Sequence, residues 1–117
     1  MADYLPLFKP GEAVTYQASA DITGGQLVEV TGDRTIGPAG ADSAKSVGVA
    51  GFDAATGDNV TVYSGGIQRP VASGAIAAGD RVGPAAAGRV ATAATVKIGT
   101  ALAAAADGEP AQIKLDN

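Results

Sequence analysis

The sequence predicts an all-β fold: a small glycine-rich barrel or sandwich of short strands, preceded by an extended N-terminal arm. Apolar and polar residues alternate in short runs, and glycine-containing turns interrupt them about every eight to twelve residues, a spacing typical of sandwiches and barrels. Of 117 residues, 26 are Ala and 17 are Gly, whereas Val, Ile, Leu and Phe together number 24. We therefore expect a folded domain with a small core.

Residues 1–10 are expected to form the arm, and residues 11–117 a single β-rich domain. Pro6 and Pro10 favour an extended backbone in the arm. An arm held extended by prolines loses little entropy on binding, so it suits docking on another protein as well as packing on its own barrel. Both interpretations stay open, and the candidate contact residues, to a partner or to a neighbouring subunit, are Tyr4, Leu5, Leu7, Phe8 and Lys9.

Alternation after residue 11 defines the expected strands. In the first, Val14, Tyr16 and Ala18 share one face, and in the second Leu27 lies on the face opposite Val28. Turns such as Thr-Gly-Asp and Ala-Gly-Asp separate the strands, because Gly supplies positive φ and Asp binds nearby backbone amides. In order, the strands are expected at residues 14–18, 26–31, 47–52, 59–63, 67–72, 81–82, 89–91, 96–101 and 111–115.

A helix is favoured locally only in the Ala-rich segment 100–106. Seven residues are marginal as an isolated helix, and Asp107-Gly108 ends the segment. We expect at most one or two helical turns there.

The second half of the sequence resembles the first half. An offset of 51 residues places Val47–Ala50 on Ile98–Ala101 and Val62 on Ile113, and an offset of 54 places Ile22–Gly25 on Ile76–Gly79. Because Ala and Gly are abundant, such matches also arise by chance. A pseudo-repeat of two similar halves is one of two open interpretations.

Composition excludes most catalytic designs. The chain has no Cys and no His, so it lacks a thiolate, a proton-shuttling imidazole and the usual zinc ligands. Residues 39–46 end in Lys-Ser but lack the two glycines of a phosphate loop, and Gly48-x-x-Gly51 lacks the third glycine of a dinucleotide site, so we interpret it as a close strand approach. No Asp-rich calcium loop occurs. We predict a non-enzymatic protein without cofactor or metal.

Charge and hydropathy also argue against nucleic acid and membrane partners. Eight basic and twelve acidic residues give a net charge of −4 with no basic cluster. The start of the chain lacks the pattern of a signal peptide, and the longest aliphatic run is far shorter than the ~20 residues that span a bilayer.

Most of the carboxylates have a structural explanation. Asp33-Arg34 and Asp80-Arg81 are candidate ion pairs within or between subunits. The aspartates expected to serve turns are Asp21, Asp33, Asp53, Asp58, Asp80 and Asp107.

A distributed set of motifs resembles the small capsid cement, or decoration, proteins of tailed phages. The motifs run from about Phe8 to Leu115 and include Phe8–Gly11, Ile22–Val28, Val47–Ala50, Gly57–Val62, Ala75–Val82 and Ile98–Ala101. The resemblance implies a β-rich virion protein that binds the outer surface of an icosahedral capsid and stabilises it. Its implied partners are the major capsid protein and itself, as a homotrimer. It also implies a place on the capsid exterior, after synthesis in the host cytoplasm.

Two alternatives remain at this point. One is a lipoyl-like carrier or small binding module; the carrier would present a lysine at a hairpin tip, and Lys45 is the candidate loop lysine. An enzyme that uses carboxylates alone, such as a glycosidase, is the other, although a chain without Trp offers little surface for stacking a sugar.

Overall fold

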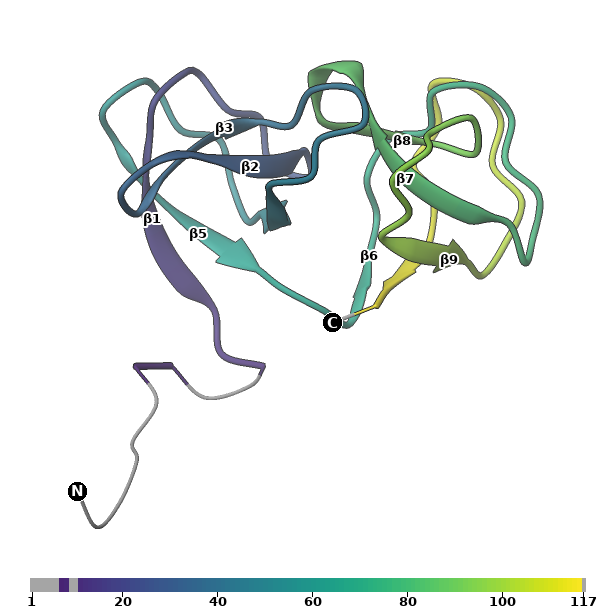
Figure 1. Ribbon diagram of the computed structural model, residues 1–117, viewed down its shortest axis with the longest axis horizontal. Helices are drawn as coiled ribbons and strands as arrows, with labels where there is room; N and C mark the ends of the chain where they lie inside the picture. Colours follow the sequence, from purple (N-terminus) through teal and green to yellow (C-terminus); the bar gives the residue numbers. More distant parts are fainter. Residues whose placement is uncertain (1–6, 9–10, 117) are drawn as a thin grey trace, which may run out of the picture.

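The structure is a computed structural model that describes residues 7–8 and 11–116, and it forms two β-rich halves side by side (Figure 1). Every regular element in this part of the chain is a strand except one 3-10 turn, so the all-β prediction is confirmed. No helix among these residues is long and apolar enough to cross a bilayer.

The first half is a closed five-stranded barrel with the strand order β1-β3-β2-β4-β5. β1 pairs in parallel with β3 and antiparallel with β5, and this double pairing closes the sheet. The strands are β1 (Val14–Ala18), β2 (Leu27–Gly32), β3 (Thr35–Pro38), β4 (Ser46–Ala50) and β5 (Asn59–Tyr63).

The second half is a five-stranded sheet with the order β6-β10-β9-β7-β8. A 3-10 turn, η1, joins β7 to β8 at the top of this half (Figure 1). The elements are β6 (Ile67–Gln68), β7 (Arg81–Ala85), η1 (Ala86–Gly88), β8 (Arg89–Ala91), β9 (Gly99–Ala101) and β10 (Ile113–Leu115).

The two halves repeat one pairing scheme, so the pseudo-repeat is real. The antiparallel bridge between Ile22 and Ala54 recurs between Ile76 and Ala105, at offsets of 54 and 51 residues. Both bridges are closed by reciprocal backbone hydrogen bonds of 2.8–2.9 Å. These are the offsets that the sequence comparison predicts.

The repeat extends to the closure of the sheet. In the first half, Ala18 of β1 pairs in parallel with Ile36 of β3. The equivalent residues Ala72 and Val90 form an isolated parallel bridge. The second half therefore carries the same closing contact, reduced to one bridge.

Each half encloses an apolar interior, and the second interior is completed by the first half. β2 lies between the two cores, because Val28 faces the barrel interior whereas Leu27, fully buried on the opposite face, packs with residues of the second half. The first half also contributes Ala39 and Val49 to that second core. The prediction that Leu27 and Val28 lie on opposite faces of the strand is confirmed. It explains how one strand contributes side chains to both cores.

The loop between β3 and β4 fastens the halves together. Asp42, at φ 55°, donates its backbone N–H to Pro84 O (3.0 Å), and its Oδ1 accepts the N–H groups of Thr95 (2.6 Å) and Val96 (3.2 Å). The repeat offset falls from 54 before this loop to 51 after it, so the first half carries three additional residues here. The difference in length between the halves thus coincides with the contact that joins them.

Several local predictions need correction. β3 was missed, because Gly37 and Pro38 are typical of turns, yet Pro38 ends the strand, where its ring is tolerated. Segment 100–106 contains no helix but the end of β9 and the bridge at Ala105, because pairing with Ile76 outweighs alanine's helix propensity. The one 3-10 turn lies instead at η1. Gly48 and Gly51 mark close strand approaches, as expected.

Candidate attachment surface

The described part of the predicted arm consists of Leu7 and Phe8. Leu7 is 90% exposed and Phe8 39% exposed. Tyr4, Leu5 and Lys9, the other predicted contact residues, lie outside the described residues. The structure therefore shows two accessible apolar side chains at the predicted place.

Arg34 links the arm to the barrel. It lies in the turn between β2 and β3 at φ 49°, and its Nη2 donates to Thr15 O at 3.3 Å. Its guanidinium carbon lies 5.1 Å from the centre of the Phe8 ring and 5.8 Å from that of Tyr16. Such cation–π contacts are worth about 0.5–1 kcal/mol each at an exposed site. Phe8 is thus held beside the first half while Leu7 stays free for contact.

Other large apolar side chains are exposed outside the arm. Tyr63 is 47% exposed and Ile67 59%, and these two residues flank the segment that joins the halves. The alternation in β5 places Val60 and Val62 in the core and Tyr63 outside, so the sequence pattern contained this signal. Phe52 and Leu102 are exposed as well.

Five of the six predicted turn aspartates accept backbone N–H groups, Asp58 and Asp80 within their own turns and the other three from a distant loop, whereas the Asp33 carboxylate accepts none from the described residues. Asp53 Oδ1 accepts the N–H of Gly24 at 2.8 Å, and Asp107 Oδ1 accepts that of Gly74 at 2.7 Å. The carboxylates of Asp21, Asp58 and Asp80 also accept backbone N–H groups. Backbone hydrogen bonding therefore accounts for these side chains without a catalytic role.

Within the chain, Arg81 does not pair with Asp80. Arg81 binds Asp116 through two hydrogen bonds of 2.6 and 2.7 Å, whereas the Asp80 carboxylate accepts the N–H of Ala77 in the turn before β7. The bonds between Arg81 and Asp116 lower the pKa of Asp116 and raise that of Arg81. Both side chains are 46% exposed, so the pair contributes little stability. Arg34, the other candidate, lies against the two rings of Phe8 and Tyr16.

Glu29 is the other carboxylate with a perturbed pKa. The Gly40 N–H donates to its Oε1 at 3.0 Å, and this bond, followed by Ser43 and the charge of Lys45, lowers the pKa of Glu29 below its ordinary value. The hydrogen bond between Gly40 and Glu29 anchors the loop after β3 to β2. Across residues 7–8 and 11–116, no group of three or more carboxylates is placed to hold a metal ion.

Lys45 does not occupy a hairpin tip. It precedes β4, and its carbonyl accepts the N–H of Val30 at 3.1 Å. β3 and β4 are both neighbours of β2 rather than of each other, so the loop between them crosses over a strand. A carrier lysine at the tip of two paired strands has no counterpart here.

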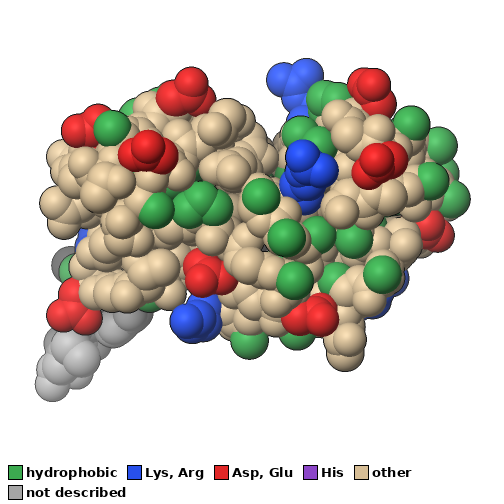
Figure 2. Space-filling view, turned by 90° about the horizontal axis from the view of Figure 1, so that it is seen from above, with side chains coloured by type: hydrophobic (Ala, Val, Ile, Leu, Met, Phe, Trp, Pro, Cys, Tyr) green, Lys and Arg blue, Asp and Glu red, His purple; other side chains and the backbone are tan. Residues whose placement is uncertain are grey.

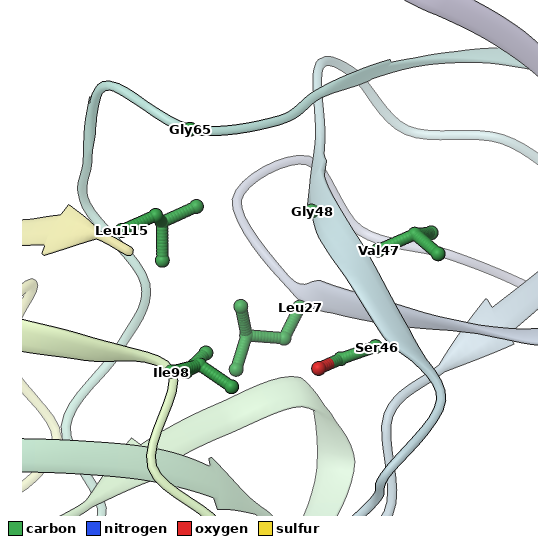
Figure 3. Close-up of a pocket in the computed structure, with 7 residues that line it drawn as sticks. All are labelled: Leu27, Ser46, Val47, Gly48, Gly65, Ile98 and Leu115. Carbon is green, nitrogen blue, oxygen red and sulfur yellow. The ribbon is translucent and has the colours of Figure 1, made fainter. Parts of the chain in front are cut away.

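A small pocket lies between the halves, with Leu27 and Ile98 pointing into it (Figure 3). Its volume is about 40 Å³, which accommodates ordered water and not a substrate. The remaining lining residues in Figure 3 are Ser46, Val47, Gly48, Gly65 and Leu115.

Comparisons with known proteins agree with this architecture. The family model described as phage cement protein matches residues 8–115. The crystal structure of the head fiber gp8.5 N base of bacteriophage phi29 has the same fold, with a TM-score of 0.71 and 21% sequence identity over 90% of this chain and 93% of that chain. No curated protein matches the sequence. The family match supports a structural protein of the virion. Because the family model covers almost the whole chain, the protein belongs to the phage cement protein family.

Proposed function

We propose that the protein is a non-enzymatic decoration protein that binds the outer surface of an icosahedral phage capsid, as trimers, and stabilises it. The observation that carries this proposal is the cement family match over residues 8–115. The perturbed carboxylates add support, since each is explained by structural hydrogen bonds and neither lies in a substrate-sized pocket.

In this proposal the arm makes the contact with the shell or with a neighbouring subunit. Leu7 is almost fully exposed, and the contact with Arg34 holds Phe8 beside the barrel, which reduces the entropy that Phe8 loses on docking. A trimer buries apolar area that a thin core leaves on the surface, such as the side chain of Ile67.

The experiment is co-sedimentation with capsids that lack the protein, after the mass in solution has been measured by light scattering. We expect the full chain to pellet with the capsids, and its bound form to raise the temperature at which they break open. Failure of the full chain to pellet contradicts capsid decoration.

Deletion of residues 2–10 tests the arm. We expect the half-saturating concentration to rise about tenfold or more, because the arm's apolar contacts are lost. Leu102→Ser is a matched control, since it alters an exposed leucine elsewhere. Undiminished binding of the deletion variant removes the arm from the mechanism.

A further inference from the structure

An open groove lies where the two halves meet. It consists of two adjoining hollows of about 390 and 460 Å³, which share Gly24, Gly25, Arg69 and Pro110. Figure 2 shows a notch between the halves, with Lys and Arg side chains beside it. The first hollow extends to Arg89, and the second extends to Tyr63.

The charge of the groove is opposite to that of the whole chain. The protein has twelve acidic and eight basic residues, yet the residues that line the two hollows include two arginines and no Asp or Glu. Asp53 lies close by, but its Oδ1 accepts the Gly24 N–H at 2.8 Å. The groove is therefore positive on an acidic protein.

The arginines are the groups left to bind a ligand. Both are exposed, and neither side chain makes a hydrogen bond or ion pair with another residue of the part that the structure describes. In the floor, by contrast, the Gly24 N–H binds Asp53 and the Gly25 N–H binds Ala50 O at 2.9 Å. These two N–H groups are therefore not available to an added strand, and the arginine side chains offer the free donors.

We propose that this groove holds an extended acidic segment of the capsid shell protein, whose carboxylates pair with Arg69 and Arg89. The proposal rests on the proposed function and names the chemistry of the partner. An extended segment fits because the two hollows are continuous and their floor carries glycines, so a backbone can approach closely. Pro110 and Tyr63 supply apolar contacts along the path, and guanidinium groups bind carboxylates through paired hydrogen bonds.

The test compares Arg69→Gln/Arg89→Gln with Lys97→Gln/Lys114→Gln in co-sedimentation with capsids. Both double variants remove two positive charges, but only the first alters the groove. We expect the groove variant to need about tenfold or more protein for half-saturation and to lose most of the salt dependence of binding. The lysine variant should bind as the unaltered chain does.

A second probe works without capsids. Nuclear magnetic resonance spectra of the ¹⁵N-labelled full chain are recorded with a capped peptide of alternating glutamate and apolar residues, and with its glutamine counterpart. We expect the glutamate peptide to shift the amide signals of Gly24 and Gly25, the glutamine peptide to shift them less, and the arginine double variant to lose the response.

The outcomes separate the two proposals. If the full chain pellets with capsids but the arginine variant binds like the lysine variant, and the peptides leave the signals unchanged, the groove proposal is wrong and capsid decoration stands. If the full chain ignores capsids but the glutamate peptide shifts the groove signals, capsid decoration is wrong and an acidic segment of another protein is the ligand. If neither probe responds, both proposals are wrong.

Discussion

Gly48 and Gly99 occupy equivalent places in the two halves, and neither leaves space for a Cβ atom. A Cβ on Gly99 would lie 2.6 Å from Ile113 Cγ2 and 2.7 Å from Lys114 O. At Gly48 the same clash involves Val62 and the carbonyl of Tyr63. Close backbone approach is therefore a repeated requirement of this fold, and glycine alone meets it without strain.

Gly99→Ala is expected to destabilise the protein by about 1–3 kcal/mol, the usual cost of overpacking a tight core. Gly32→Ala is the control, because a Cβ there would meet Thr35 Cβ at an ordinary 3.6 Å. Chemical denaturation of both variants gives the difference. Equal stability of the two would show that the strands can move apart at Gly99.

Glu29 makes stability depend on pH. Its folded-state pKa lies below the ordinary value of 4.5, because the Gly40 N–H stabilises the carboxylate. Its contribution is therefore complete above about pH 4.5 and is lost as the pH falls through the lowered pKa. We expect Glu29→Gln to reduce stability at neutral pH and to lose less of it on acidification than the unaltered chain, as melting temperatures measured from pH 7 to pH 3 would show. Parallel curves would contradict this role.

Residue-scale predictions succeeded where the interaction is local. Asp58 and Asp80 each bind an amide three residues earlier, so their turn role was visible in the sequence. The partner of Arg81 was not visible, because Asp116 is separated from it by 35 residues and reaches it only through the folded sheet.

The loop between β3 and β4 is the element that distinguishes the first half from the second. Asp42 is at φ 55°, a conformation that Asp and Asn tolerate better than most residues, and it binds the opposite half through its carboxylate. The longer loop therefore joins the two halves through the hydrogen bonds of Asp42.

Asp42→Ala is expected to cost about 1–2 kcal/mol, from two lost hydrogen bonds and the strained conformation of alanine. Asp42→Asn should cost less, because its amide oxygen still accepts the bond from Thr95 and asparagine tolerates positive φ. Denaturation midpoints compare the two variants. If both match the unaltered chain, this loop does not fasten the halves.

The elements that were missed share one cause. β3 contains Gly37 and Pro38, and segment 100–106 is rich in alanine, so local propensity pointed to a turn and a helix respectively. β3 pairs with the adjacent β2 and with β1, and Ala105 forms an isolated bridge with Ile76. Hydrogen bonding to these partners outweighs a local preference worth less than about 1 kcal/mol per residue.

At the scale of the whole molecule, the halves share a core and are expected to unfold as one unit. The sequence predicts a single domain over residues 11–117, and this stays a prediction that the shared core favours, since Leu27, Ala39 and Val49 pack among residues of the second half. Differential scanning calorimetry should show one transition, with equal calorimetric and van't Hoff enthalpies. Two separate transitions would instead identify two independent domains.

Leu27→Ala tests the shared core directly. Leu27 is fully buried, so the variant should lose about 2–5 kcal/mol while still unfolding in one step. Leu102→Ala, at a leucine that is 44% exposed, should change stability by less than about 0.5 kcal/mol. Loss of stability in the second half alone would show that the halves are coupled weakly.

The sequence alone was sufficient for the β class, most strands, the local turn roles of Asp58 and Asp80 and the resemblance to cement proteins, because all of these rest on local alternation, turn chemistry and short motifs. It left the two-half repeat as one of two interpretations. Tertiary structure decided the rest. The closure of the barrel, the burial of Leu27 and the positive groove with Arg69 and Arg89 each join residues from distant parts of the chain. Short glycine-rich strands specify their register weakly, so only the packing of complete halves selects these neighbours.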